Sequence, residues 1–599
     1  MPIQHSRTKP EYSVDAAPLR GYDFIMEINT FIGARDKARN LAKTQGDRLS
    51  FARSFLAELI AAYLPWATQS PVKLSGHSLA REMGKLAAAL EPEMAAYLIG
   101  TTYTVMLPGD YRGKYGVFYT PPALTSRLLD LSEQAGVDWG AARAIDPACG
   151  GGAFLAPVAK RMALSLSTLT ACERLAHIES RLVGYEIDSF SAWISQVFVE
   201  AVLKDDIESA GRPLRSLVNV RDSLQTSTSE YGRYDLIIGN PPYGKVKLLP
   251  EQREHWGRSL YGHANLYGLF TDLAVRLATK DGIIAYITPT SFLGGQYFQA
   301  LRALLGKVAP PVAFDFIAHR EGVFADVLQE TLLSAYRKRP GRRKVSVSYL
   351  SVKETGRLTI KSNGRCALPA SPDKPWILPR VPSQADLAQS CERLTHRLSD
   401  LGYTVSTGPL VWNRHKPKLL DDRASGAIPV VWAECVNPSG SGEFTFKATA
   451  RNHKPWFRPE PKDEPNIVRD ACVLLQRTTS MEQSRRLVAA ELPQSFIDQH
   501  GGAVTIENHL NMVKPIPGQT PKVSARAIAT LFNSETLDQV FRCINGSTAV
   551  SAYELESLPI PAPDALRRLD GMIARRAKKE TIEKAIKEMY EHVSERAAA

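Results

Sequence analysis

Apolar and polar positions divide the chain into stretches of different periodicity. Up to about residue 110, apolar residues recur at helical spacing, as in residues 54–64 and 86–90. This spacing predicts a mainly helical N-terminal region. Between about residues 111 and 340, short apolar runs alternate with helical patterns. That alternation predicts an α/β domain with a largely parallel sheet.

Five apolar runs are candidate strands of this sheet, and several of them end in a polar or glycine-rich turn. They are residues 144–145, 182–185, 218–220, 236–238 and 283–287. Ligands of open α/β sheets bind at the carboxyl ends of the strands. We therefore expect the functional site at these turns.

The pattern changes again after a basic run at residues 338–344, which we interpret as a linker. The sequence beyond it is irregular and rich in Pro and Gly, and a charged helix is predicted from about residue 564. A single core rarely exceeds roughly 250–300 residues, so 599 residues predict several parts. The expected parts are a helical region (1–110), an α/β domain (111–340), a separate mixed α/β domain (341–563) and a C-terminal helix (564–599).

Charge and composition narrow the function only slightly. The net charge is +12, and residues 341–599, with 37 basic and 28 acidic residues, carry +9 of it. This bias suits a polyanionic partner, although a solvated surface explains it equally well. None of the seven cysteines forms a C-x-x-C pair, so neither a zinc knuckle nor a disulfide framework is expected. Without an apolar run of roughly 18–20 residues or a signal-peptide core, the sequence predicts a cytoplasmic protein with no membrane contact.

The first chemical motif is the run Asp146-Pro147-Ala148-Cys149-Gly150-Gly151-Gly152, which follows a short predicted strand. Glycines such as Gly150 and Gly152 let the backbone turn tightly and approach a ligand closely. Glu186, the next acid at a strand end, comes 34 residues after Gly152. The dinucleotide-binding pattern places that acid after about 20 residues, so NAD fits poorly.

Three acids end three successive predicted strands, namely Asp146, Glu186 and Asp222. A carboxylate at Glu186 could accept hydrogen bonds from both hydroxyls of a ribose, and Asp222 could accept one from an adenine amine. A solvated turn is the simpler interpretation of any one of these acids. The ordered series instead favours a slot shaped for a nucleoside.

The most specific motif is Asn240-Pro241-Pro242-Tyr243, which directly follows a buried-type strand. An aromatic amine is a poor nucleophile because its lone pair is delocalised into the ring. Hydrogen bonds from the amine to the Asn240 side-chain oxygen and the Pro241 carbonyl would favour a tetrahedral nitrogen. Pro241 and Pro242 make the loop rigid, and Tyr243 offers a flat face on which a base can stack.

These motifs together resemble the gamma-class N6-adenine DNA methyltransferases of restriction–modification systems. In that class a cofactor segment, a glycine motif, two acids and Asn-Pro-Pro-Tyr precede a C-terminal target-recognition domain. Gly116-Val117-Phe118-Tyr119-Thr120-Pro121-Pro122 matches the first segment. One departure is the triple glycine, where the class more often has Ser or Thr.

The resemblance implies a Rossmann-like fold that uses S-adenosylmethionine (SAM), and it implies roles for individual residues. The residues that would contact the cofactor are Tyr119, Thr120, Asp146, Ala148, Glu186, Ile187 and Asp222. Asn240, Pro241 and Tyr243 would hold the target adenine, and a later aromatic would cover its other face. Phe298 is our choice for that aromatic, with Phe292 and Tyr297 as competitors and a core Phe as the structural alternative.

Two further features concern DNA and catalysis. Arg414, Lys416 and Lys418, with Trp412 nearby, form a basic and aromatic cluster that suits phosphate contact and base reading. Cys149 invites comparison with the nucleophile of cytosine-C5 methyltransferases. It lies in the cofactor turn rather than in the catalytic loop, so we expect no catalytic role for it.

The function implied is transfer of a methyl group from SAM to the N6 amine of a flipped-out adenine in double-stranded DNA, without a metal, in the prokaryotic cytosol. The alternatives are a protein-glutamine methyltransferase, an RNA N6-adenine methyltransferase and a non-catalytic DNA-binding specificity protein. The first 110 residues show no convincing Pro-Asp with Glu/Asp-x-Lys nuclease pattern. We therefore expect a separate restriction endonuclease as partner, or none.

Overall fold

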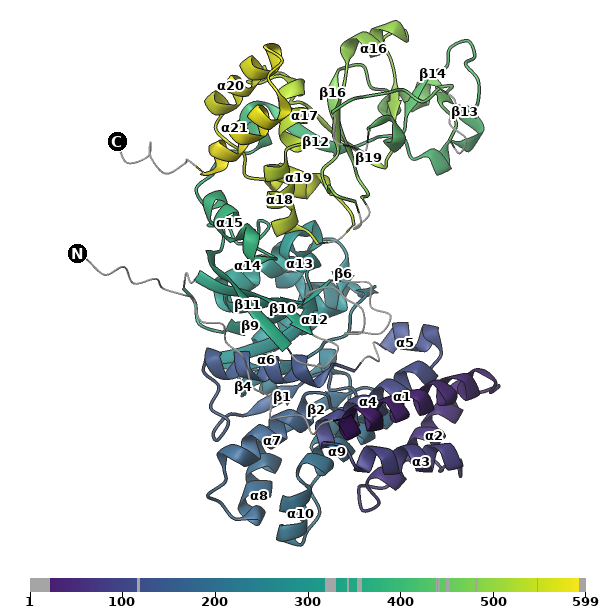
Figure 1. The fold of residues 1–599 in the computed structure, drawn as a ribbon, viewed down its shortest axis with the longest axis vertical. Helices are drawn as coiled ribbons and strands as arrows, with labels where there is room; N and C mark the ends of the chain where they lie inside the picture. The colour runs from purple at the N-terminus through teal and green to yellow at the C-terminus, as the bar shows by residue number, and fades with distance from the viewer. Residues whose placement is uncertain are drawn as a thin grey trace, which may run out of the picture. The chain divides into compact units, whose positions relative to one another are not determined.

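The structure, a computed structural model, divides into two compact units (Figure 1). The first unit comprises Met1–Pro289 and Ala300–Arg365, and the second comprises Thr290–Gln299 and Cys366–Ala599. The described residues are 22–591 except 116–118, 318–329, 342–343, 353–357, 438, 440–441, 449–452, 480–482 and 547.

The first unit begins with helices, as the apolar spacing predicts. Helix α2 turns Phe55, Leu56 and Leu59 into the core, and the Asp47 side chain caps its first turn by accepting a hydrogen bond from the Ser50 amide. The N-terminal helices are α1 (Tyr22–Lys43), α2 (Arg48–Tyr63), α3 (Ser78–Ala88), α4 (Pro92–Met106) and α5 (Gly109–Tyr115).

A nine-stranded mixed sheet, in the order β11-β10-β8-β9-β7-β4-β1-β2-β3, is the centre of the first unit. All five runs predicted as strands are present, and β9 is antiparallel to both of its neighbours. The α/β class is therefore confirmed. The strands are β1 (Ala144–Asp146), β2 (Leu182–Glu186), β3 (Val218–Val220), β4 (Tyr234–Gly239), β7 (Ala278–Pro289), β8 (Pro311–Ile317), β9 (Thr331–Arg337), β10 (Lys344–Val352) and β11 (Leu358–Ala367).

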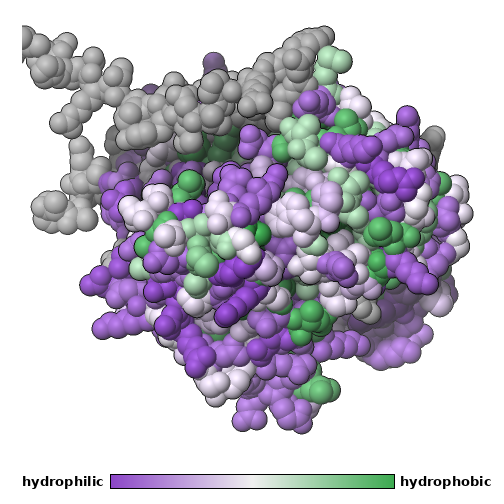
Figure 2. Space-filling view, turned by 90° about the horizontal axis from the view of Figure 1, so that it is seen from below, coloured by the Kyte–Doolittle hydropathy of each residue, from purple (hydrophilic) through white to green (hydrophobic). Residues whose placement is uncertain are grey.

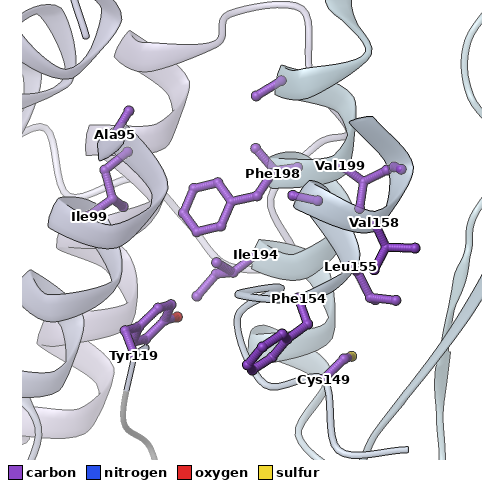
Figure 3. Close-up of a cluster of buried hydrophobic side chains, with 14 of the residues drawn as sticks. Ala95, Ile99, Tyr119, Cys149, Phe154, Leu155, Val158, Ile194, Phe198 and Val199 are labelled. Carbon is purple, nitrogen blue, oxygen red and sulfur yellow. The ribbon is translucent and has the colours of Figure 1, made fainter. Parts of the chain in front are cut away.

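Helices between these strands share one hydrophobic core with the N-terminal helices. Figure 3 shows Ile99 of α4 near Phe198 of α9, with Leu155 of α7 on the other side. The helices in this core are α6 (Pro122–Ala135), α7 (Leu155–Ser165), α8 (Ala171–Arg181), α9 (Ser189–Val202) and α10 (Lys204–Ala210). Three further helices come later in the chain, α11 (Pro250–His255), α12 (Leu266–Leu277) and α14 (Gln299–Val308). A short hairpin of β5 (Lys245–Val246) and β6 (Ala264–Asn265) lies between β4 and α12 in the chain.

The second unit contains two four-stranded sheets, in the orders β12-β19-β16-β17 and β13-β15-β14-β18. The first sheet is antiparallel, and its apolar face packs with helices in a second core. The strands are β12 (Tyr403–Thr407), β13 (Leu419–Leu420), β14 (Ile428–Val431), β15 (Trp456–Phe457), β16 (Cys472–Gln476), β17 (Ala489–Leu492), β18 (Thr505–Ile506) and β19 (Leu510–Pro515). The helices are α13 (Ser291–Gly294), α15 (Ala385–Cys391), α16 (Gln494–Gln499), α17 (Ala525–Phe532), α18 (Glu535–Ile544), α19 (Ala552–Ser557), α20 (Pro563–Ala574) and α21 (Lys579–Glu591).

Two features differ from the boundaries drawn on the sequence. The sheet continues past residue 340 through β10 and β11, so the units divide near Arg365. The predicted C-terminal helix is two helices, α20 and α21, because the chain turns at Arg576, whose φ is 54°.

The surface has the character expected of a protein in contact with water. The face in Figure 2 is mostly hydrophilic, with hydrophobic residues scattered singly or in small groups. Over the described part of the chain, no helix combines the length and apolar character needed to cross a bilayer.

Candidate active site

A pocket of about 700 Å³ lies in the first unit, where β1, β2, β3 and β4 end. Ligand pockets of proteins measure roughly 300–1,000 Å³. Most residues predicted for the site line this pocket: Tyr119, Thr120, Asp146, Ala148, Gly150, Glu186, Ile187, Asp222, Asn240 and Pro242. Gly152 lines a neighbouring cavity of about 310 Å³ instead, and Pro241 and Tyr243 lie outside both linings.

The glycine turn after β1 has the backbone conformation that the sequence predicts. Gly150 and Gly152 have φ angles of 50° and 79°, which L-residues with a side chain rarely adopt. A Cβ atom at Gly152 would lie 2.9 Å from the Cα of Ser195, so α9 approaches the turn closely. The turn is therefore fixed by its glycines in both conformation and packing.

The carboxyl group of Asp146 is almost fully buried, with an exposed fraction of 1%. Burial raises its pKa to about 8, although the Ala148 amide donates a hydrogen bond of 3.0 Å to its Oδ1. A Cβ atom at Gly239, the last residue of β4, would lie 2.6 Å from the same oxygen. Glycine at that position leaves room for the carboxyl group at the strand ends.

Glu186 is held at both carboxylate oxygens by backbone amides. The Gly150 amide donates to Oε2 and the Asp188 amide donates to Oε1, each at 2.9 Å. Burial raises the pKa of Glu186, and the nearby charge of Asp188 acts in the same direction. The glycine turn and the end of β2 are therefore connected through one carboxylate.

Ile187 and Asp222 complete this wall of the pocket. Ile187 is 59% exposed, an unusual exposure for a large apolar side chain beside a cavity. Asp222 is half-buried, accepting at Oδ1 from the Leu224 amide and at Oδ2 from the Gln225 side chain, both at 3.0 Å. An apolar surface thus stands beside a fixed hydrogen-bond acceptor.

Two hydroxyl groups at the pocket have no hydrogen-bond partner among the described residues, Tyr119 Oη and Thr120 Oγ1. Both are buried, and a buried polar group without a partner is unusual in a folded protein. Gly116, Val117 and Phe118, the start of the predicted cofactor segment, lie outside the described residues.

The polar groups of the pocket match those of an adenosyl sulfonium compound. Such a molecule offers ribose hydroxyls, an exocyclic amine and positive charge. The pocket lining offers five carboxyl groups, among them Asp146, Glu186 and Asp222, together with two hydroxyls without partners and the apolar side chain of Ile187. The residues present therefore fit SAM. Within the described ranges, no cluster of three His, Cys, Asp or Glu side chains could hold a metal ion.

The loop after β4 carries a hydrogen bond that the sequence does not predict. The Tyr243 hydroxyl donates to Asn240 Oδ1 at 2.7 Å and lies 3.3 Å from the carbonyl oxygen of Ile287. The Tyr243 ring meets Tyr267 edge-on, with 6.0 Å between centroids. Burial raises the pKa of Tyr243, so its hydroxyl stays protonated and can donate.

Sequence reasoning missed most of the opposite wall of the pocket. It includes Trp256 after α11 and Leu266 and Phe270 of α12. His255, which follows the catalytic loop and which the sequence offers as a possible DNA contact, also lines the pocket. Burial lowers the pKa of His255. The apolar residues of α12 have the spacing of an ordinary core helix, so the sequence carries no signal that distinguishes those facing a ligand.

Cys149 also lines the pocket, yet its thiol is poorly suited to attack a base. Its exposed fraction is 4%, and burial raises its pKa well above the usual value. A raised pKa disfavours the thiolate, which is the nucleophilic form. This agrees with the expectation that Cys149 has no catalytic role.

The aromatic residues predicted for the second face of the base belong to the second unit. Phe292 is 1% exposed and meets Trp376 edge-on at 6.0 Å, as a core residue does. Tyr297 is 48% exposed, and Phe298 is half-buried. Phe292 therefore has the surroundings of a core residue, and Phe298 stays our prediction for the second face of the base.

The basic cluster of the second unit is exposed at Arg414 and Lys416. Lys416 Nζ lies 5.1 Å from the centre of the Trp412 ring, a cation–π contact. Lys418, two residues later, instead forms ion pairs with Glu460 and Asp463 at 2.9 and 2.6 Å. Only the first two cations are therefore presented to solvent.

The sequence is similar to methyltransferases of restriction–modification systems. The sequence profile of the Eco57I restriction-modification methylases matches residues 171–324. Type II methyltransferase M.BsuBI of Bacillus subtilis is 25% identical over 465 residues, covering 76% of this chain and 89% of that protein. Type II methyltransferase M.PstI of Providencia stuartii is 26% identical, covering 57% of this chain and 68% of that protein.

Solved structures with the same fold belong to restriction–modification enzymes. The Type IIL enzyme MmeI, solved in complex with DNA, aligns with a TM-score of 0.52 at 13% identity over 97% of both chains. The Type ISP enzyme LlaBIII, bound to DNA, aligns with a TM-score of 0.50 at 10% identity over 93% of this chain and 47% of that one. At these identities the structural matches support the fold alone.

Proposed function

We propose that this chain is a site-specific DNA methyltransferase of a restriction–modification system, similar to the Eco57I-type methylases. In this proposal it uses SAM to methylate the N6 amine of an adenine flipped out of double-stranded DNA. The observation that carries this proposal is the composition of one pocket. Asp146, Glu186 and Asp222 line one wall, and Asn240 lies at the end of β4 in the same pocket.

The first wall suits the methyl donor. We assign the ribose hydroxyls to the Glu186 carboxylate, the adenine amine to Asp222 and the adenine ring to Ile187. We assign Asp146 and the hydroxyls of Tyr119 and Thr120 to the methionine part of SAM. SAM supplies, when bound, a methyl group that is already activated on a sulfonium sulfur.

Asn240 is the residue we assign to the target amine. Its Oδ1 can accept two hydrogen bonds, and Tyr243 occupies one of them. The second lone pair is available for the N6 amine, and the Pro241 carbonyl offers another acceptor. Held this way, the amine nitrogen presents its lone pair to the methyl carbon and afterwards releases a proton to solvent. Positioning is the main contribution of the protein.

The target adenine has to leave the base stack, since its amine is otherwise enclosed in the duplex. We propose that Tyr243 supports one face of the base. Arg414 and Lys416 of the second unit are proposed to contact the DNA. The sequence recognised and any endonuclease partner would be identified in cells, by sequencing that reports modified bases in DNA from a strain expressing the chain.

The substitution Asn240→Ala tests the catalytic assignment. We expect a loss of at least roughly 100-fold in methylation rate, with SAM binding and duplex binding retained, because only positioning of the amine is removed. The measurement is incorporation of labelled methyl groups into duplex DNA, beside calorimetric titration with SAM.

Tyr243→Phe is the matched variant for this experiment, because it keeps the ring and removes only the hydroxyl that holds Asn240. We expect a smaller loss than for Asn240→Ala. Undiminished activity of Asn240→Ala would refute the role of this residue. Methylation of structured RNA or of a protein substrate, in place of duplex DNA, would support one of the alternative functions instead.

A further inference from the structure

Arg53, on the N-terminal helix α2, reaches the loop that follows β2 in the pocket wall. Its Nη2 lies 2.6 Å from Asp188 Oδ1 and donates to the Tyr111 hydroxyl at 3.1 Å. The side chains of Arg53 and Asp188 are only 25% and 16% exposed. An ion pair so shielded from water is stronger than one on the surface.

Asp188 is connected directly to the residue we assign to the ribose. It lines the pocket, and its amide donates to Glu186 Oε1 at 2.9 Å. Its other carboxylate oxygen accepts from the Ser191 amide at 3.0 Å and so caps α9. The position of Asp188 therefore sets one of the two hydrogen bonds that orient the Glu186 carboxylate.

Arg53 brings a positive charge next to two neighbouring carboxylates. Glu186 and Asp188 lie two residues apart, and the charge of Asp188 contributes to the raised pKa of Glu186. Arg53 pairs with Asp188 and so offsets part of this repulsion. Without Arg53, the repulsion between the two neighbouring carboxylates would be stronger and the pKa of Glu186 would rise further.

The guanidinium group is fixed by more than its ion pair. It lies 5.5 Å from the centre of the Phe190 ring, at the start of α9, and its Nε donates to the Tyr103 hydroxyl of α4 at 3.4 Å. Tyr103 in turn packs on Phe190, with 5.4 Å between ring centroids. A planar group fits this surrounding, and a lysine ammonium would not reproduce its contacts.

We infer that Arg53 is a positioning residue for the methyl-donor pocket, and that through it the N-terminal helices complete that pocket. This inference rests on the function proposed above. Arg53 touches neither substrate nor donor, since it acts through Asp188 on the orientation and charge of Glu186. The helical region thereby gains a role in binding the donor that its sequence does not indicate.

The test compares Arg53→Met with Arg81→Met. Arg81 pairs with Glu58 at 3.0 Å between α3 and α2, within the same group of helices but outside the pocket lining. We expect Arg53→Met to weaken SAM binding about tenfold in calorimetric titration, with kcat at saturating SAM changed less than about twofold. Arg81→Met should bind SAM as the unaltered protein does.

A double variant separates positioning from a general loss of structure. Asp188→Asn removes the charge while the amide side chain can still cap α9. Introduced beside Arg53→Met, it should recover most of the lost affinity, because the uncompensated carboxylate is gone. Addition of the two losses, with no recovery, would overturn the inference, as would Arg53→Met binding SAM within about twofold of the unaltered chain.

Thermal melting of each variant completes the design. Should Arg53→Met fail to fold, Arg53→Lys and the double variant carry the test. Arg53→Lys should lose less SAM affinity than Arg53→Met, because it keeps the charge beside Asp188 but not the contacts of the guanidinium group. An unaltered chain that does not bind SAM at all would contradict the proposed function itself. An unaltered chain that binds SAM, beside an Arg53 variant that binds equally well, would contradict only the role of Arg53.

Discussion

Individual carboxyl groups in the pocket hold their protons differently because their surroundings differ. Asp146 is almost completely buried and accepts a hydrogen bond from the Ala148 amide, so burial dominates and its pKa rises to about 8. Glu186 receives two amide hydrogen bonds, which partly oppose the effect of its burial. At neutral pH the unliganded protein therefore holds Asp146 mainly in its neutral form.

This protonation makes SAM binding depend on pH. A cationic ligand favours ionised Asp146, and ionisation costs less as the pH approaches its pKa. We expect the Kd for SAM to fall as pH rises from 6 to about 8, by up to roughly tenfold per unit, and then to level off. Calorimetric titration across this range measures the effect.

The matched variant for the pH experiment is Asp146→Asn, which has no proton to release. At pH 8 its affinity for SAM should be lower than that of the unaltered chain. Between pH 6 and 8 its Kd should hardly change. An identical pH profile in both proteins would exclude Asp146 as the titrating group.

A site residue could be predicted from the sequence when its signal lies in neighbouring residues, and not when its position depends on residues far along the chain. Asp146, Glu186 and Asn240 were identified because each follows an apolar strand in a recognisable order. Phe270 of the pocket lining and Arg53, which pairs with Asp188, were not identified, because their positions depend on how helices distant in the sequence pack. The hydrogen bond between Tyr243 and Asn240 joins two neighbours in the motif, yet side-chain orientation is not encoded in residue type alone.

Among the elements, the turns at strand ends position the site, and the glycine turn between β1 and α7 is the most constrained of them. Gly152 combines a left-handed backbone with close approach to Ser195 of α9. The strands that deliver these turns were predictable because their apolar runs are short and bounded by turns. The division of the tail at Arg576 was not, since nothing in the sequence marks an arginine for a positive φ.

Substitution of the turn glycine should therefore affect both binding and stability. Gly152→Ala places a Cβ against the Ser195 backbone at an unfavourable φ, and we expect a loss of about 1–3 kcal/mol in the free energy of unfolding. SAM affinity should fall as well, because the turn shifts. Chemical denaturation and calorimetry measure the two effects.

Gly140→Ala is the control for this change. A Cβ there would lie 3.4 Å from an Asp138 side-chain oxygen, an ordinary contact, and its φ is not left-handed. It should leave both quantities close to those of the unaltered chain. Equal effects of the two substitutions would mean that the turn has no special requirement for glycine at position 152.

At the scale of the whole molecule, the donor pocket belongs to one unit and the exposed cations Arg414 and Lys416 belong to the other. Residues 341–599 also carry +9 of the net charge of +12. Lysine and arginine contacts to phosphate release counterions, which makes DNA binding depend on salt concentration. Substitutions at the pocket should therefore change SAM binding, whereas substitutions at Arg414 and Lys416 should change DNA binding and its salt dependence.

Replacing Arg414 and Lys416 by alanine should weaken duplex binding and reduce the salt dependence. If each contacts one phosphate, the slope of log K against log salt should become less steep by about 1.8. SAM affinity should not change. Lys418→Met is the control, because that ammonium already pairs with Glu460 and the buried Asp463.

The control should lower thermal stability, since it leaves the Asp463 carboxylate with fewer partners, and it should leave the salt slope unchanged. A salt slope that is unaffected by the Arg414 and Lys416 replacements would remove these residues from the proposed DNA contact.

Residues 290–299 leave the first unit between β7 and α14 and are counted with the second, where Phe292 meets Trp376 and the Leu293 carbonyl accepts from the Trp376 amide. The chain thus contributes to the second unit twice. On the proposal that the second unit contacts DNA, exchanging it for the corresponding unit of a relative would need two replacements, residues 366–599 and residues 290–299, both taken from the same relative.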